Sequence, residues 1–383
     1  MSTALRIVQR ATVYDAERQS VDRRVACFTS LCALRSGRWL ASFQVGSRKH
    51  AADSTVQICG SDDGGRSWSQ LDPQLSSQWQ GRPGSLAAGE LLETSPGRLL
   101  LFSTWYDRSE PDRPLFDPVT EGILRSRQLV AESRDDGHSW SAWRAIPTGE
   151  LTGCATTGPP LRWNDGRIAY AFESFKEFDD VRPAPHRAWL VESLDEGRTF
   201  GEPRLVAFDS TEQLAYWDQR LVATETPGEY VGLFWTHRRA AQRDINVHVV
   251  RGSLRTSDEQ RAVPHESPIR GQIAAPVVLP DGRLFALVVD RAGPCTIRLW
   301  CSPDGGQTWP TDRSLVVYEH DERAMLHQRG IEVDYAQYWE DMGKWSFGHP
   351  ALRPFDDRHL LAAWYAGRPD TMSVHCAKIE IPS

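Results

Sequence analysis

The octapeptide Ser61-Asp62-Asp63-Gly64-Gly65-Arg66-Ser67-Trp68 decides the fold, because three related octapeptides follow it at residues 133–140, 193–200 and 302–309. All four fit the pattern Ser-x-Asp-x-Gly-x-Ser/Thr-Trp/Phe, and their first residues are 72, 60 and 109 positions apart. Asp and Gly favour a tight turn, the hydroxyl and carboxylate groups can bond the turn amides, and the aromatic ring can pack beneath. Four copies at such spacing predict a repeat protein built from hairpins, with the octapeptide aspartates forming turns at its outer rim.

A second pattern, turn residues followed by an apolar strand, recurs six times between the octapeptides. Its copies begin at residues 36, 96, 165, 227, 281 and 356. Six units of roughly 60 residues, each able to supply four short strands, fill the 383-residue chain. We therefore expect one all-β domain over residues 1–383, a six-bladed β-propeller of four-stranded antiparallel blades.

The composition agrees with short strands and tight turns, since the chain has 29 Gly, 24 Pro and 15 Trp. A net charge of −7 argues against a nucleic-acid partner. Arg6 and Arg10 interrupt the N-terminal region, which therefore lacks the apolar stretch of a signal peptide, and no later run is long enough for a membrane helix. Seven scattered cysteines without a C-x-x-C pair argue against a disulfide framework or a zinc site. We expect a cytoplasmic protein with no metal, no cofactor and no membrane partner, and no feature indicates its oligomeric state.

The octapeptide resembles the Asp-box, or BNR repeat, of the sialidase (neuraminidase) superfamily, and the resemblance covers nearly the whole chain. It implies a propeller that binds a carbohydrate substrate in a central cleft. The Asp-box also occurs in non-catalytic propellers and in other glycosidases, so it implies the fold rather than one particular activity.

The resemblance assigns three catalytic positions. Asp53 follows Arg48 by five residues and precedes the first octapeptide, as the general acid/base aspartate does in sialidases. Asp218, in the segment 216–221, takes the place of the glutamate that polarises the nucleophile. His349, in the segment 347–352, stands where the family has its tyrosine nucleophile.

The arginine clamp of the family is incomplete in this chain. Arg238 matches one arginine, the stretch 27–31 has none, and the third position falls on Cys295, with Arg291 and Arg298 close by. Three guanidinium groups serve to hold the carboxylate of a sialic acid from several sides, and the tyrosine serves the same anomeric carbon. The absence of both the complete arginine clamp and the tyrosine nucleophile implies a substrate other than a standard sialoside.

The remaining groups suit sugar chemistry. Asp53 and Asp218 would be the two carboxylates of a glycosidase, and His349 could transfer protons near neutral pH. Arg48 and Arg238 could hold hydroxyls or a carboxylate, so a glycan containing a uronic acid is one option. Further binding candidates are aromatic and polar residues near strand ends: His50, Trp105, Tyr106, Asp107, Glu173, Trp217, Gln272, Asp290, Arg291 and Tyr365.

Three function classes follow from these residues. The first is an exo-acting, sialidase-like glycoside hydrolase, which we expect. The second is a polysaccharide lyase, in which His349 or Tyr365 removes the proton next to a uronate carboxylate that an arginine neutralises. The third is a carbohydrate-binding propeller that has lost its activity together with the clamp.

Overall fold

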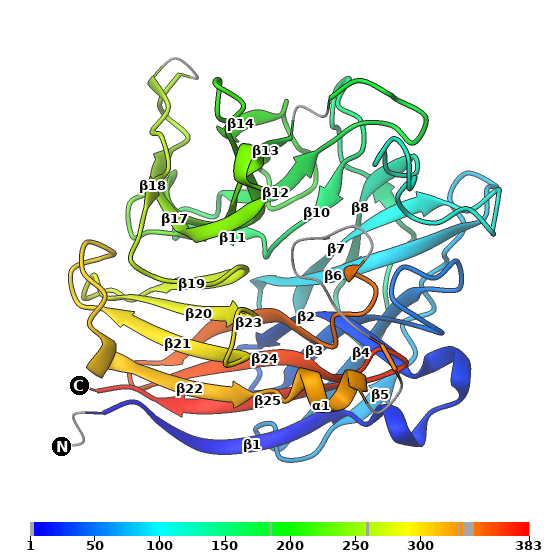
Figure 1. Ribbon diagram of the computed structural model, residues 1–383. Helices are drawn as coiled ribbons and strands as arrows, with labels where there is room; N and C mark the ends of the chain where they lie inside the picture. The colour runs from blue at the N-terminus through cyan, green and yellow to red at the C-terminus, as the bar shows by residue number, and fades with distance from the viewer. Residues whose placement is uncertain (1–3, 184–185, 258–259, 328–329, 332–340, 383) are drawn as a thin grey trace.

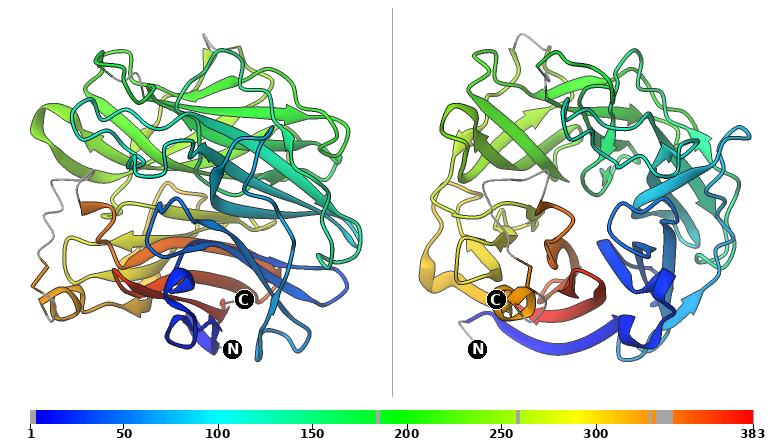
Figure 2. Two further views of the ribbon diagram at one scale, coloured as in Figure 1. Left: turned by 90° about the vertical axis from the view of Figure 1, so that its right-hand side faces the viewer. Right: turned by 45° about the vertical axis from the view of Figure 1, so that its right-hand side comes forward.

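The computed structural model describes residues 4–183, 186–257, 260–327, 330–331 and 341–382, and most of its regular structure is β-strand. The described strands form five hydrogen-bonded sheets. Figure 1 and the right-hand view of Figure 2 show these sheets arranged around a common axis, as in a propeller. The molecule is therefore all-β, as the turn-rich composition predicts.

Four of the sheets are blades with a path of four antiparallel strands. One contains β6 (Gly84–Ser95), β7 (Arg98–Asp107), β8 (Ser126–Ser133) and β9 (Arg144–Ala145). The next contains β10 (Ala155–Thr156), β12 (Ile168–Ser174), β13 (Arg187–Ser193) and β14 (Arg204–Ala207), and β11 (Leu161–Arg162) also pairs with β12. The third contains β15 (Leu214–Ala223), β16 (Glu229–Arg238), β17 (Arg243–Ser253) and β18 (His265–Glu266). The fourth contains β19 (Ala274–Val278), β20 (Leu284–Asp290), β21 (Thr296–Ser302) and β22 (Ser314–Glu319).

The fifth sheet has eight strands and joins the two ends of the chain. It contains β23 (Phe347–Asp356), β24 (His359–Arg368), β25 (Thr371–Glu380), β2 (Val25–Ala33), β3 (Trp39–Gly46), β4 (Thr55–Ser61), β5 (Ser69–Leu71) and β1 (Arg6–Tyr14). Strand β1 runs antiparallel to β25, and a parallel bridge between Val25 and Met372 joins β2 to β25. Figure 1 shows β1 beside β25, with the two termini close together.

The expectation of six separate four-stranded blades is wrong. The first and last parts of the chain hydrogen-bond to each other through Val25 and Met372, so that their strands form one eight-stranded sheet beside four four-stranded blades. The number of sequence repeats shows how many similar segments the chain contains. It does not show which of these segments hydrogen-bond to each other in one sheet.

Each octapeptide forms the turn after the third strand of its group, since Ser61, Ser133, Ser193 and Ser302 end β4, β8, β13 and β21. In all four, the serine hydroxyl donates to the aspartate Oδ1 at 2.8 Å. The hydroxyl at the seventh position donates to Oδ2 at 2.5 to 2.7 Å. The octapeptide aspartates are thus used by their own turns, as the pattern predicts.

The core consists of apolar clusters within and between neighbouring sheets. Each of the four octapeptide aromatics belongs to a different cluster or packs against it: Trp68, Trp140, Phe200 and Trp309. The largest cluster joins β19–β22 to β23–β25. Helical segments are short: η1 (Ala16–Arg18), η2 (Val21–Arg23), η3 (Arg239–Ala241), η5 (Thr311–Arg313) and α1 (Glu322–His327). Within the described ranges, no helix has the length and apolarity needed to cross a membrane.

Candidate functional site

Four strands carry the same irregularity. Strands β2, β6, β15 and β23 each contain a bulge in which two residues oppose one on the partner strand. The first residue of each bulge has a positive φ: Phe28 (58°), Ala88 (57°), Asp218 (46°) and His349 (44°). Such φ values are uncommon for residues other than glycine, and bulges frequently re-aim side chains beside active sites. Phe28, Ala88 and Asp218 line one pocket, so the bulges bring residues of three sheets together.

This pocket has a volume of about 170 Å³ and a largely apolar wall, to which seven large aromatic side chains contribute: Phe28, Tyr106, Phe116, Phe175, Trp217, Trp235 and Trp345. Its polar side chains are His50, Thr104, Thr156, Thr157, Glu173, His186 and Asp218. An apolar cavity of about 150 Å³ can hold benzene, so the pocket has room for a ligand of about one ring. Aromatic walls with a few polar groups suit a sugar, which has an apolar face and hydroxyls at its edge.

Asp218 supplies one of the two carboxyl groups among the described residues that line the pocket. Its side chain is 27% exposed, and its Oδ1 lies 3.9 Å from Nη2 of Arg220. Burial raises the pKa of Asp218 to about 6, and the Glu173 carboxylate adds to this rise, while Arg220 and Arg291 oppose it. Asp218 therefore keeps its proton at a pH at which an ordinary aspartate has lost it, which suits a general acid.

Glu173 supplies the second carboxyl group, and it also holds the bulge at Asp218. Its Oε1 accepts a 2.8 Å hydrogen bond from the backbone amide of Gln219, and its Oε2 lies 2.9 Å from Nε2 of His186. The Gln219 side chain donates to the carbonyl oxygens of Phe172 and Trp189, at 2.7 and 2.9 Å. These bonds fasten the β15 bulge to β12 and β13, so Glu173 determines where the Asp218 carboxyl points.

Trp217 gives the pocket a fixed aromatic surface. Its ring stacks on His237 with centroids 4.8 Å apart and an interplanar angle of 12°. Trp235 meets it edge-on at 5.3 Å, and His186 does so at 6.2 Å. Because neighbouring rings hold Trp217 in place, little conformational freedom is lost when a ligand stacks on it.

Charged side chains buried next to Asp218 connect three sheets. Arg220 is 1% exposed, and its Nη1 donates to the carbonyl oxygen of Pro350 at 3.2 Å. Glu90 is equally buried, with Oε2 3.8 Å from Nη2 of Arg353. Burial raises the pKa of Glu90, and the charges of Arg220 and Arg353 counteract that rise. Arg220 thus interacts with both Asp218 and Glu90, and its positive charge lowers the free-energy cost of burying these two acidic groups.

The two histidines proposed from the sequence, His50 and His349, are held in the neutral form. Burial lowers the pKa of His50 to about 3, with Lys49 and Arg108 adding to the effect. The pKa of His349 is also well below its usual range, chiefly through burial. His50 lines the pocket, whereas His349 contacts Phe28 of the wall, with ring centroids 5.2 Å apart.

Asp53 and Arg48 lie outside the wall of the pocket. Both side chains are exposed, and Oδ1 of Asp53 accepts a 3.2 Å hydrogen bond from the amide of Ser47. Arg108 interacts electrostatically with both of them, and it also donates to the carbonyl oxygen of His50 at 2.7 Å. The predicted pair is therefore close to the His50 edge of the pocket, but Asp218 and not Asp53 is in the wall.

Trp105 and Tyr106 are adjacent on β7 and have different surroundings. Trp105 is buried in the core, where its Nε1 donates to the carbonyl oxygen of Ser77 at 2.8 Å, while Tyr106 lines the pocket. Side chains alternate between the two faces of a regular strand, so Tyr106 faces the pocket and Trp105 faces the opposite side of β7.

Three further candidates are also absent from the pocket wall. Asp107 pairs with Arg82 at 3.1 Å. Tyr365 is buried with Lys49 Nζ 4.8 Å from its ring centroid, and Arg238 is the last residue of β16.

Gln272 and Arg291 line a different cavity, together with Asp244 and Asp290. The guanidinium of Arg291 donates to the side-chain oxygen of Gln272 and to the carbonyl oxygen of Phe347. Gln272 Nε2 in turn donates to Asp244 Oδ2 at 2.9 Å.

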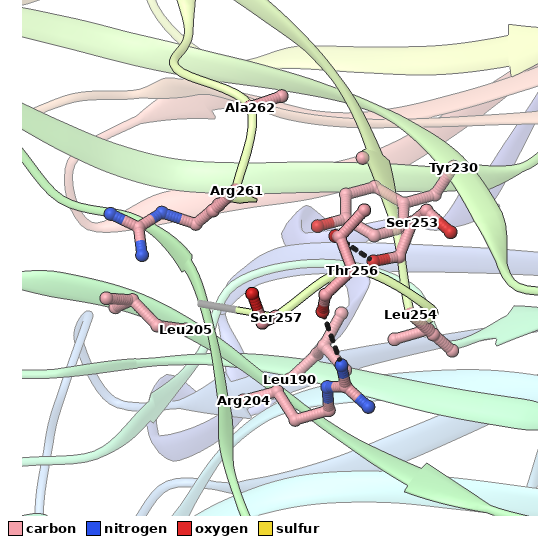
Figure 3. A pocket seen from close by; sticks show the side chains of 11 residues that line it. Leu190, Arg204, Leu205, Tyr230, Ser253, Leu254, Thr256, Ser257, Arg261 and Ala262 are labelled. Atoms are coloured by element: carbon pink, nitrogen blue, oxygen red, sulfur yellow. Dashed lines mark hydrogen bonds between the residues drawn. The ribbon is translucent and has the colours of Figure 1, made fainter. Parts of the chain in front are cut away.

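A small hollow elsewhere has room for little more than a water molecule, at about 20 Å³. Figure 3 shows its wall, where Arg204 donates to the carbonyl oxygen of Thr256 at 2.9 Å. Among the described residues that line this hollow there is no Asp or Glu, and its size excludes a sugar ring. In the described ranges, no group of three or more His, Cys, Asp or Glu is arranged to hold a metal ion.

Several members of the wall were not named as candidates from the sequence, and Glu173 was undervalued. Phe28 and His186 were not among the candidate site residues, and Glu173 was only one of several polar candidates at strand ends. Phe28 lies in an apolar stretch whose bulge carries no glycine, so its positive φ has no signature in the sequence. His186 precedes β13, and only the pairing of β12 with β13 brings it to Glu173.

No protein-family model matches the chain, and no curated protein matches it. Solved structures do match it. A protein of unknown function from Dyadobacter fermentans is 18% identical, with a TM-score of 0.70 over 99% of this chain and 100% of that one. The Hadza microbial sialidase Hz136 is 16% identical, with a TM-score of 0.67 over 97% and 68%. The Penicillium chrysogenum alpha-L-arabinanase, complexed with arabinobiose, is 14% identical, with a TM-score of 0.61 over 98% of both chains. The chain thus has a propeller fold that is shared with solved sialidases and an arabinanase.

Proposed function

We propose that the protein is a glycoside hydrolase that cleaves a glycan other than a standard sialoside in the aromatic pocket. One observation carries the proposal: Asp218 and Glu173 line the same pocket and are linked through the backbone amide of Gln219. Glycosidases use two carboxyl groups beside the scissile bond. The fold shared with sialidases and an arabinanase agrees with this assignment but does not by itself select an activity.

In the proposed reaction, Asp218 is the general acid, because its raised pKa keeps it largely protonated up to about pH 6. It transfers its proton to the glycosidic oxygen as the bond between that oxygen and the anomeric carbon breaks. Glu173 acts on the anomeric carbon, either directly or by accepting a proton from the attacking water. Trp217 holds the sugar by stacking. Asp53, at the His50 edge, is the alternative general acid suggested by the sequence.

The pocket favours a neutral sugar. None of the described residues in its wall is a lysine or arginine, so none of these residues would neutralise the carboxylate of a sialic acid or a uronic acid. Arg291, the candidate for the third clamp position, already donates to Gln272 and to Phe347. The uronic acid considered from the sequence therefore has less support in this pocket than a neutral residue, and so does the lyase mechanism, which needs a neutralised uronate.

A carbohydrate-binding protein without activity is the second candidate, and one observation favours it. Both oxygens of Glu173 already have hydrogen-bonding partners inside the protein, Gln219 and His186. If Glu173 only positions the bulge, the described wall of the pocket has one reactive carboxyl group, and binding without cleavage would result.

The decisive experiment incubates the protein with neutral, uronate-containing and sialylated oligosaccharides and follows new reducing ends. We expect reducing ends from a neutral oligosaccharide and their absence with Asp218→Asn protein that retains the wild-type circular dichroism spectrum. An unsaturated, ultraviolet-absorbing product would instead establish a lyase, and binding without products would establish the second candidate. Sialoside cleavage as fast as that of a sialidase would refute the proposed substrate class.

A further inference from the structure

Three tryptophans of the pocket wall are connected through contacts between their rings. Trp217 lies on β15, Trp235 on β16 and Trp345 in the segment before β23. The ring centroid of Trp235 is 5.3 Å from that of Trp217 and 5.7 Å from that of Trp345. Trp217 and Trp345 are therefore the two outer members of this group, and their positions shape the surface on which a sugar can stack.

Each outer tryptophan is supported by a polar side chain that is not among the described residues of the wall. His237 stacks on Trp217, and its Nδ1 lies 3.1 Å from Oδ1 of Asp244. The Arg291 guanidinium lies 4.6 Å from the ring centroid of Trp345, within the range of an attractive cation–π contact. The orientation of each ring thus depends on a neighbour outside the pocket.

Gln272 joins these two supports. Its Nε2 donates to Oδ2 of Asp244 at 2.9 Å, and its Oε1 accepts a hydrogen bond from the Arg291 guanidinium. A carboxylate can only accept hydrogen bonds and a guanidinium can only donate them, so an amide, which does both, suits this position. A continuous series of contacts therefore leads from one outer tryptophan to the other, in this order: Trp217, His237, Asp244, Gln272, Arg291 and Trp345.

We propose that Gln272 is a positioning residue, which holds Trp217 and Trp345 in the arrangement that receives the sugar. The inference rests on the proposed function, because it takes the aromatic pocket to be the sugar site. Gln272 is not among the described residues of the wall, so it acts on the ligand through its hydrogen bonds to Asp244 and Arg291. Both Gln272 and Arg291 are buried, at 5% and 3% exposure, so a broken bond between them is not replaced by bulk water.

The test breaks the Gln272 contact and then restores it. Gln272→Glu keeps an acceptor for Arg291 but opposes the Asp244 carboxylate with a second acceptor. Adding Asp244→Asn restores the hydrogen bond with its direction reversed, because the asparagine amide can donate to the new carboxylate while its oxygen faces His237. Gln272→Met removes both bonds without adding a charge, and it serves if Gln272→Glu fails to fold.

Gln57→Glu is the matched control. Gln57 on β4 is also 5% exposed, and it is outside the described wall of the pocket. Its Oε1 accepts a 2.7 Å hydrogen bond from Arg23 Nη2, and its Nε2 donates to the carbonyl oxygen of Leu71 at 2.7 Å. The control therefore makes the same chemical change to a buried glutamine between an arginine and an acceptor.

The first measurement needs no ligand. Fluorine NMR of protein labelled with 5-fluorotryptophan resolves the tryptophans, and Trp217→Phe and Trp345→Phe assign the two resonances of interest. We expect both resonances to shift or broaden in Gln272→Glu, to return to their wild-type positions in the double variant and to stay unchanged in Gln57→Glu.

The second measurement is the dissociation constant, by calorimetry, of the saccharide that binds most tightly in an array of neutral mono- to tetrasaccharides. Gln272→Glu should bind it about tenfold more weakly, the loss of roughly one hydrogen bond to a charged group, and the double variant should bind it like the wild type. If Gln272→Glu or Gln272→Met leaves the resonances and the affinity unchanged, or if the folded double variant stays impaired, the positioning role is refuted and the proposed function stands. If the wild-type protein binds no saccharide, both proposals are refuted.

Discussion

The Glu173 carboxylate accepts a 2.8 Å hydrogen bond from the backbone amide of Gln219, the residue directly after Asp218. The two carboxyl groups of the pocket are thus coupled through one peptide unit, although they lie 45 positions apart in the sequence. A side chain of β12 thereby stabilises the positive φ of Asp218 on β15, because the bulge it belongs to would otherwise leave a buried amide without an acceptor.

This coupling predicts that two substitutions of Glu173 have different effects on the free energy of unfolding. Glu173→Gln keeps an acceptor for the Gln219 amide and a polar group next to His186, so its free energy of unfolding should stay within about 1 kcal/mol of the wild type. Glu173→Ala leaves the buried amide unpaired and should cost about 1–3 kcal/mol. Urea unfolding measures both values. Glu192→Ala is the control, since Glu192 pairs with Arg167 at 2.7 Å in the same sheet but outside the pocket. Equal stability of the two Glu173 variants would contradict the proposed fastening of the bulge.

A second prediction separates the two candidate acids. Asp218→Asn should lower kcat on a cleaved oligosaccharide by roughly 10²–10⁴-fold, the usual contribution of a general acid, with little change in KM. Asp53→Asn should have a much smaller effect, because Asp53 is exposed outside the pocket wall. Steady-state kinetics on both variants decide between them. The reverse order would return the role of general acid to Asp53, as the family resemblance implies.

The octapeptides show how far the sequence alone could predict this fold. Their Asp, Gly and hydroxyl residues interact within eight positions, so the turns were predictable from local pattern, and the all-β class followed from them. The number of separate sheets did not follow, because it depends on the bridge between Val25 and Met372, which are 347 positions apart.

The same distinction applies to the site. Asp218, Trp217 and His50 line the pocket and were named from the sequence, because the segments 48–53 and 216–221 resemble motifs of the sialidase superfamily. Trp105 and Tyr106 were both candidates, and only Tyr106 lines the pocket, because the sequence does not show which face of β7 meets the pocket. Glu173 and His186 matter through contacts between strands β12, β13 and β15, and no local pattern encodes those contacts.

A third prediction concerns the octapeptide turns. Asp135 accepts bonds from Ser133 Oγ, from the amide of Ser139 and from Ser139 Oγ, whereas the neighbouring Asp136 is not bonded to these groups. Asp135→Asn should destabilise the protein by about 1 kcal/mol, comparable with the loss of a helix cap, and leave kcat unchanged. Asp136→Asn is the matched control, because asparagine tolerates its φ of 56°. Thermal unfolding measures the difference, and equal melting temperatures would contradict the role of the turn.

The fourth prediction is a pH dependence of stability with a defined sign. Burial raises the pKa of folded Asp218 to about 6, whereas the unfolded residue titrates near 3.8. Below pH 3.8 both states are protonated and ionisation of Asp218 costs nothing. Between that pH and 6 the unfolded chain releases a proton that the folded protein retains, so the folded state loses stability as the pH rises. The loss should be on the order of 2 kcal/mol, because each unit of pKa difference corresponds to about 1.4 kcal/mol and the side chain is still partly hydrated.

Urea unfolding of wild-type and Asp218→Asn protein from pH 4 to pH 7 measures this effect. The difference in free energy of unfolding, wild type minus variant, should fall across this range and level off above pH 6. Asp135→Asn provides a control whose effect should stay constant from pH 4 to pH 7, because hydrogen bonds lower the pKa of Asp135 to about 2 against the effect of burial. Its stabilising contribution is present above pH 3.8 and is lost as the pH falls through 2. A wild-type minus Asp218→Asn difference that is flat or rises with pH would show that Asp218 is ionised in the folded pocket, and it would then act as a carboxylate rather than as the general acid.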